Sequence, residues 1–105
     1  MRAGQLRKRI VVEQVTETLN AQGEPLPSWG AFATVWAAIA PLAGRELYAA
    51  QQRAAQVTHL VIMRYLPGLT PKMRVNFGGR VFDILDVLNL EERDREMHVL
   101  CKERL

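Results

Sequence analysis

A glycine pair, Gly78-Gly79, separates two segments of alternating hydrophobicity and constrains the fold more than any other feature of the chain. Two-residue loops of this kind are typical of tight β-hairpins, because glycine readily adopts the positive φ angles that such turns require. If residues 72–77 and 80–88 pair around the loop, apolar side chains meet on one face and opposite charges meet on the other. The predicted partners are Phe77 with Arg80, Val75 with Phe82, Met73 with Ile84, and Arg74 with Asp83. A shift of one residue would destroy these matches, so the pattern also predicts the register.

Three further segments contain several β-branched and aromatic residues and predict β-strands: residues 6–18, 32–42 and 57–66. Residues 96–104 predict a last strand, because Met97, Val99 and Cys101 lie on one phase. In the first segment, Leu6, Ile10 and Val12 lie on one phase and are expected to face a core. The segment 57–66 is apolar on both phases, which favours burial on both faces and would suit an interface with a neighbouring copy. Six strands in 105 residues predict a mainly β fold, a small six-stranded antiparallel β-barrel or sandwich.

Two segments lack the strand pattern. The first, residues about 19–30, contains two prolines and two glycines and predicts a long loop. Loops of this length are usually functional or mobile. Residues of about 45–55 contain no β-branched side chain, and Leu47, Ala50 and Ala54 recur at helical spacing. They predict one short helix, which would be only marginally stable without tertiary contacts.

The inventory of reactive side chains argues against an enzyme. A chain of 105 residues is expected to form a single domain, residues 1–105, with one core and no room for a deep enclosed cleft. It has one serine, one cysteine and two histidines, and Ser28 lies in a segment rich in proline and glycine. His98 and Cys101 are three residues apart, so a strand would point them to opposite faces and they could not share a metal ion. We therefore expect no catalytic, cofactor-binding or metal-binding residues.

The charge of the chain is mildly basic, with 14 lysines and arginines against 11 acidic residues. The net charge of +3 is too small to establish a nucleic-acid partner by itself. Residues 25–44 carry no charge and have the length of a membrane span, but prolines interrupt them. A buried strand with its lead-in is the preferred interpretation, and no membrane partner is expected.

Several short motifs, in their order and spacing, give the chain a family resemblance over nearly its full length. They are Met1-Arg2-Ala3-Gly4, Val35-Trp36-Ala37, Gly44-Arg45-Glu46, Met63-Arg64-Tyr65, Met73-Arg74-Val75, Phe82-Asp83-Ile84 and Leu100-Cys101. With these motifs the chain resembles the phage head-closure proteins, which are also called head–tail joining, stopper or connector proteins.

The resemblance implies a structural subunit of the virion neck, made in the host cytoplasm and located at the head–tail interface of a phage or prophage particle. It implies a homo-oligomeric ring, typically a dodecamer, whose subunit can remain monomeric until its partners are present. Those partners are the adaptor and portal ring, the tail terminator or tail tube, and packaged DNA held without sequence specificity. The segment between the second and third strands, about 41–56, would project into the channel and help to close it.

The resemblance also assigns candidate roles to residues. The closure segment contains Gly44, Arg45, Glu46, Tyr48 and Arg53. Contacts with the adaptor, a neighbouring copy or DNA are expected at Arg2, Arg7, Lys8 and Arg9. Anchors of the core or of an interface are Trp29, Trp36, Val75 and Phe82.

Ordinary structural roles remain open for the same residues. The basic residues near the start of the chain could form a solvated tail and an exposed strand face. Arg45 and Glu46 could simply begin a helix, where an acidic residue is favoured by the helix dipole. Arg64 and Arg74 are expected to pair with acidic residues on the sheet surface, and Cys101 to be a buried apolar residue. The alternative function is that of a small β-barrel that binds nucleic acid, which the basic start and a pI near 9.5 favour.

Overall fold

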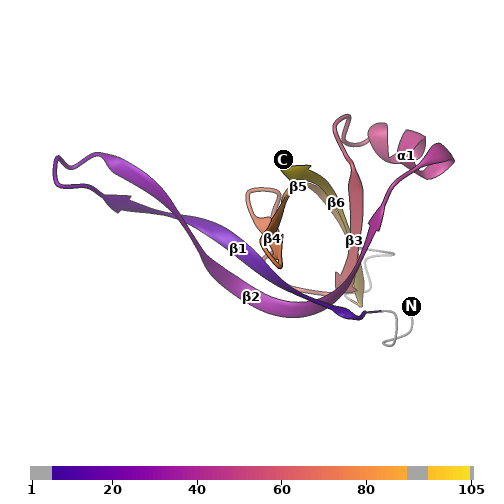
Figure 1. Cartoon of the computed structure of the whole chain (residues 1–105), viewed down its shortest axis with the longest axis horizontal. Coiled ribbons are helices and arrows are strands. Elements are labelled where there is room, and N and C mark those ends of the chain that lie inside the picture. The colour runs from indigo at the N-terminus through magenta and orange to yellow at the C-terminus, as the bar shows by residue number, and fades with distance from the viewer. Residues whose placement is uncertain (1–5, 90–94, 105) are drawn as a thin grey trace.

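The computed structural model describes residues 6–89 and 95–104, which form a closed six-stranded antiparallel barrel with one helix outside it (Figure 1). The predicted mainly β fold with a single short helix is therefore confirmed, and the barrel is the correct choice over the sandwich. Around the barrel the strands follow the order β1-β2-β3-β6-β5-β4. The elements are β1 (Lys8–Leu19), β2 (Pro25–Pro41), α1 (Gly44–Gln51), β3 (His59–Arg64), β4 (Arg74–Phe77), β5 (Arg80–Asn89) and β6 (Glu96–Arg104).

The barrel interior is filled by the inward-facing residues that strand alternation predicts. Leu6, Ile10 and Val12 are buried, as expected from their common phase. The core cluster of buried residues contains Ile10, Val12, Ala37, Val61, Met63, Leu69, Val75, Phe82, Ile84, Met97, Val99 and Cys101. Cys101 is completely buried, so its predicted role as a small apolar residue is confirmed.

The register predicted for the β4–β5 hairpin is confirmed. Val75 pairs with Phe82 and Phe77 with Arg80, while Gly78 and Gly79 both have positive φ angles in the turn. Beyond the assigned strand β4, the N–H of Ile84 donates to the carbonyl of Met73 at 3.4 Å, which continues the same register. Arg74 also lies opposite Asp83 as predicted.

The long loop predicted for residues about 19–30 is wrong, because half of it, residues 25–30, belongs to β2 and Leu19 belongs to β1. Only residues 20–24 form a turn, closed by the Asn20 side chain, which accepts hydrogen bonds from the N–H groups of Gln22 and Glu24. Strand residues two apart point their backbone nitrogens to the same side. Pro25 and Pro27 are therefore tolerated, because both place their nitrogens at the free edge of this ribbon, where no ladder hydrogen bond is lost. Strand pairing therefore continues to Leu19 opposite Pro25.

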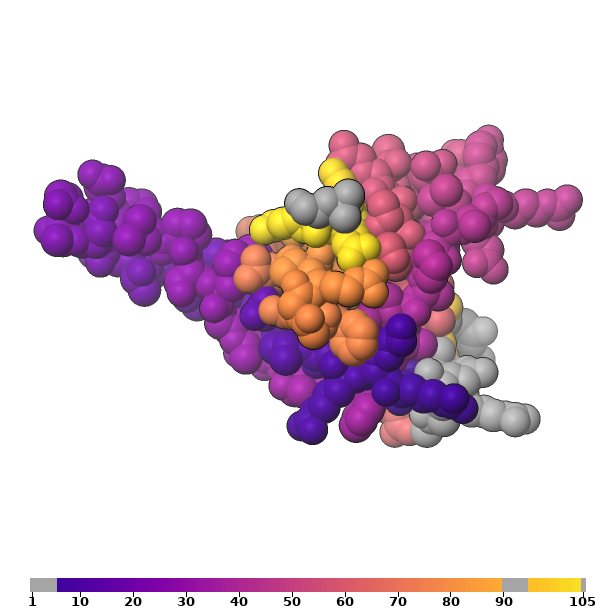
Figure 2. All heavy atoms as spheres, viewed as in Figure 1, coloured from indigo at the N-terminus to yellow at the C-terminus, as the bar shows by residue number. Residues whose placement is uncertain are grey.

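The distal part of the β1–β2 hairpin projects from the barrel as a two-stranded ribbon, which we call the arm and define as residues 14–30 (Figures 1 and 2). The arm has only two strands, because β4, which pairs with the other edge of β1, reaches only Val11, Val12 and Glu13. The long axis of the molecule is 49 Å, against 27 Å for the other two, and six ribbon residues at about 3.4 Å each account for most of the difference.

Helix α1 lies outside the barrel and is shorter than the predicted 45–55, ending at Gln51. Leu47, Ala50 and Ala54 lie at or near the helix and contact a second apolar cluster built on Val57 and Leu100. Leu60 on β3 also packs against this cluster. The second apolar phase of segment 57–66 is thus partly covered within the chain, in agreement with the predicted burial on both faces, and an interface of this segment with a neighbouring copy stays a prediction. In the described part of the chain, no helix has the length and apolar character needed to cross a membrane.

Candidate assembly surfaces

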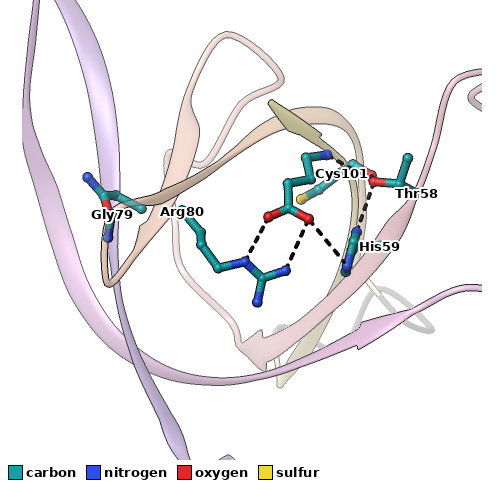
Figure 3. Close-up of polar contacts among 7 residues, drawn as sticks. Thr58, His59, Gly79, Arg80 and Cys101 are labelled. Atoms are coloured by element: carbon teal, nitrogen blue, oxygen red, sulfur yellow. Dashed lines mark hydrogen bonds and ion pairs between the residues drawn. The ribbon is translucent and has the colours of Figure 1, made fainter. Parts of the chain in front are cut away.

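One end of the barrel is closed by three polar side chains, which we call the rim cap: His59, Arg80 and Glu103. Each lies on the inward phase of its strand, two residues before or after a buried core residue. Arg80 donates from Nε to Glu103 Oε2 at 2.7 Å and from a terminal nitrogen to Oε1 at 3.1 Å. Arg80 and His59 point toward one another across the barrel end (Figure 3). His59 Nε2 lies 3.9 Å from Glu103 Oε1.

The rim cap covers the core residue Phe82. The His59 ring meets the Phe82 ring edge-on at a centroid distance of 5.1 Å, and the Arg80 guanidinium lies 5.1 Å from the same ring centroid. The hydrogen bonds from Arg80 lower the pKa of Glu103, and the same pairing raises the pKa of Arg80. The cap therefore places a charged, hydrogen-bonded group where a ligand-binding barrel would have its open mouth.

Neither histidine nor the cysteine is arranged as a nucleophilic site. Burial, with a smaller contribution from the charge of Asp83, raises the pKa of Cys101 to about 12, so the thiolate that nucleophilic chemistry requires does not form near neutral pH. His59 Nδ1 lies 2.9 Å from Thr58 Oγ1, an ordinary hydrogen bond between neighbouring side chains. His98 Nε2 lies 3.0 Å from Glu96 Oε1.

The candidate closure residues lie together on or beside α1. Gly44 begins the helix with a φ of +59°, Glu46 lies in the first turn, and Tyr48 is 69% exposed. Arg53 lies just beyond the helix and is held by Asp86 of β5, with Nε 2.9 Å from Oδ2. A groove of about 360 Å³ runs between α1 and the sheet. The predicted segment is therefore an exposed helix attached to the barrel by a small apolar contact and one ion pair, and its role in a channel stays a prediction.

The basic residues at the start of β1 are exposed, as either of their predicted roles requires. Arg7, Lys8 and Arg9 all lie on the surface, and Lys8 Nζ lies 5.4 Å from the centroid of the Phe77 ring. Arg2 lies outside the described residues. Arg64 lies opposite Glu96 in the β3–β6 ladder.

Elsewhere on the barrel, arginines are neutralised by acidic partners. Arg74, predicted to pair with an acid on the sheet surface, contacts Glu13 of β1 at 2.8 Å rather than Asp83, the residue opposite it. Asp83 contacts Arg104 at 2.6 Å. These pairs, with those of Arg53 and Arg80, account for four of the arginines and reduce the positive surface open to a polyanion.

The four predicted anchors divide into two kinds. Val75 and Phe82 are completely buried, so they are core residues. Trp29 is half-buried, and its ring lies 4.1 Å from the guanidinium carbon of Arg74. Trp36 is 54% exposed, so it is not a core residue, because it falls on the outward phase of β2 beside the inward-facing Ala37. Its predicted alternative role at an interface remains a prediction.

Trp36 lies in a groove of about 530 Å³ at the barrel end opposite the rim cap. We call it the aromatic groove, and its lining residues are Leu6, Val35, Trp36, Arg64 and Tyr65. Three apolar side chains on the arm, Val15, Leu19 and Leu26, are also exposed. None of these three arm residues is among the candidate residues predicted from the sequence. The signal that could have found them is the absence of any lysine or arginine between residues 10 and 44.

A barrel filled by its own side chains, with an exposed helix, a projecting arm and an aromatic groove, is a small β-barrel module whose distinctive surfaces lie on its exterior. The family comparison agrees with this class. Residues 1–104 match the family model for the phage head completion protein, and the chain belongs to that family.

Individual relatives match over nearly the whole chain. The head completion protein gp7 of Enterobacteria phage HK97 is 26% identical over 107 residues, covering 97% of this chain and 96% of that protein. The solution structure of protein SF1141 from Shigella flexneri 2a has a TM-score of 0.80 and 28% identity, covering 98% and 96% of the two chains. A chain from the virion of a native gene transfer agent particle shares the fold, with a TM-score of 0.61 and 21% identity over 94% and 96%.

Proposed function

We propose that the chain is a head–tail connector subunit of a tailed phage or prophage, forming a ring below the portal and adaptor that closes the DNA channel and docks the tail. The observation that carries the proposal is membership of the head completion family over residues 1–104. The likeness to a head completion protein of phage HK97, over nearly the full length of both chains, supports it.

The physical features of the subunit fit such a role. A ring requires a heterologous interface, in which two different surfaces of one chain meet. The arm and the aromatic groove are two different surfaces, both with exposed apolar side chains. A small barrel with a filled core supplies a rigid body between them.

Helix α1 is the proposed closure element. It protrudes from the barrel (Figure 2) and exposes Tyr48, while the segment after it is tethered by the ion pair of Arg53 with Asp86 and by a hydrogen bond from Lys102 to Gln56. In a ring, every copy would present the same helix around the axis, together with Arg45. Contacts with DNA would then be repeated and independent of base sequence.

Electron microscopy of reconstituted complexes tests the proposal. The purified chain is mixed with portal–adaptor complexes of a phage whose head completion protein it replaces, and we expect a symmetric ring of added density below the adaptor. Tight, salt-sensitive binding of the free chain to DNA, with no binding to portal–adaptor complexes, would instead support the nucleic-acid-binding barrel.

A second measurement separates closure from docking. The double variant Arg45→Ala/Tyr48→Ala changes exposed side chains of α1, so we expect it to fold and form the ring but to let DNA escape from filled heads. Gln51→Ala, at the last residue of the same helix, is the matched control. DNA retention equal to that of the unmodified chain would contradict the closure role of α1.

A further inference from the structure

The arm is an amphipathic ribbon with one apolar face exposed. Residues two apart on a strand share a face, and paired residues on adjacent strands lie on the same side. One face of the arm therefore carries Val15, Glu17 and Leu19 from β1 and their partners Trp29, Pro27 and Pro25 from β2. It is apolar except for a single carboxylate, Glu17, and its distal residues are exposed.

This exposed face needs a partner. A two-stranded ribbon without a third strand or a covering layer is only marginally stable in water. Leu19 is 73% exposed and Val15 is 42% exposed. Contiguous apolar surface of this kind marks a protein–protein contact.

The aromatic groove has the complementary composition. Trp36 and Tyr65 expose their rings in it, Leu6 and Val35 form its apolar lining, and Arg64 supplies one exposed positive charge. Arg9 lies directly opposite Trp36 in the β1–β2 ladder and is also exposed, so it adds a second positive charge beside the groove.

Charge is segregated between the arm and the rest of the chain. The arm carries two carboxylates, Glu17 and Glu24, and no lysine or arginine, whereas all 14 basic residues lie elsewhere. The apolar face with one carboxylate thus matches an apolar groove with a neighbouring arginine. Such complementarity sets register and partner choice at an interface.

The arm cannot fill the groove of its own chain. Leu6 lines the groove just before β1 begins, and Leu19 lies at the far end of the same strand. The eleven steps from Lys8 to Leu19 correspond to roughly 35 Å of extended strand, which holds the two sites apart. Figure 1 shows the start of β1 and the tip of the arm on opposite sides of the barrel.

We propose that the arm of one copy docks its Val15–Glu17–Leu19 face in the aromatic groove of a second copy, with Glu17 beside Arg64 of the receiving barrel. This inference rests on the proposed function, because it names the contact through which the connector ring is built. The contact is heterologous, so repetition generates a closed ring when the rotation between copies closes.

Charge reversal in the reconstituted portal–adaptor complex tests the pairing. We expect Glu17→Arg and Arg64→Glu each to reduce ring formation about tenfold or more, and the double variant to restore it, because the opposite charges meet again. Glu24→Arg is the matched control, since it makes the same charge change in the turn of the arm, away from the docking face, and we expect it to form rings normally. Thermal unfolding of each isolated variant verifies that all of them fold.

Cross-linking identifies the partner directly. In the Glu17→Cys/Arg64→Cys double variant, mild oxidation should link neighbouring copies into a covalent ladder, whereas each single cysteine variant should give no ladder. Cys101 does not compete, because it is completely buried.

The outcomes separate this inference from the proposed function. Absence of ring density with the unmodified chain would refute the connector role. Normal rings with either charge-reversed single variant, failure of the double variant to recover, or cross-links to an adaptor subunit instead of a second copy would overturn the docking of the arm while leaving the connector role intact.

Discussion

The substitution Leu100→Ala tests whether α1 can detach from the barrel while the barrel stays folded. Leu100 is 4% exposed on the outer face of β6, beneath α1, whereas its neighbour Val99 is completely buried inside the barrel. An isolated helix of eight residues is far below the length that is stable in water, so α1 depends on this outer cluster. We therefore expect Leu100→Ala to release the helix before it destabilises the barrel.

The size of the effect follows from the contacts of the helix. A buried Leu→Ala substitution costs about 2–5 kcal/mol when the surrounding structure stays in place. The cluster holds the helix segment through half-buried Leu47 and the methyl groups of Ala50 and Ala54, which amounts to about 2–3 kcal/mol at about 0.8 kcal/mol per buried carbon. Once the helix opens, residue 100 has lost its contacts with the helix in both proteins, so we expect the global loss to stay close to this closing free energy.

Hydrogen exchange measured by mass spectrometry or NMR distinguishes local from global opening. In Leu100→Ala we expect the amides of α1 to lose about 30- to 150-fold in protection, while urea unfolding shows a loss of stability of no more than about 3 kcal/mol. Val99→Ala is the control, with a global loss of about 2 kcal/mol and no selective loss in α1. Unchanged exchange of α1 in Leu100→Ala, or a global loss well above the limit, would refute the reasoning.

Three further perturbations test the core, the rim cap and the buried thiol. Phe82→Ala should cost about 3–5 kcal/mol in urea unfolding, because the ring is completely buried, and a loss below about 1 kcal/mol would contradict its place in the core. Glu103 has a lowered pKa in the folded chain, so its contribution to stability is present above the ordinary carboxyl pKa and is lost as the pH falls through the lowered value. Glu103→Gln should thus flatten the acid side of the stability–pH curve, and an unchanged curve would contradict the pairing with Arg80. Because the pKa of Cys101 is raised to about 12, a maleimide at pH 8 should label it only after unfolding, and rapid labelling of the folded chain would show that it is accessible.

Sequence patterns predicted those parts of the fold whose strand bounds and register depend on residues close together in the chain. The β4–β5 register follows from two glycines and the alternation beside them, and all of that information lies within 17 residues of sequence, 72–88. The bounds of β6, Glu96–Arg104, follow from the same alternation. Hydrophobicity alone left Trp36 open between a core and an interface role, and only its phase on β2, which places it outside the barrel, excludes the core role.

The rim cap required the topology. Alternation predicts that Arg80 and Glu103 share the phase of core residues, but not that β3, β5 and β6 bring their ends to the same rim. The order of strands around a closed barrel follows from long-range pairing, such as β3 with β6, which nothing near either segment specifies. The candidate closure residues were easier to place, because four of the five lie within one short helix, Gly44–Gln51, and Arg53 follows two residues after its end.

The β2 half of the arm, residues 25–30, was missed for a different physical reason, and that reason bears on the function of the arm. Strand prediction from sequence depends on one buried face, and the distal arm has none within its own chain. Pro25 and Pro27 favour the prediction of a loop, because proline breaks a central strand. A ribbon with free edges nevertheless accepts them. The same prolines remove two backbone donors from that edge, which disfavours the addition of another strand. The arm is therefore suited to docking through the side chains of one face, and Val15, Glu17 and Leu19 are the side chains that face presents.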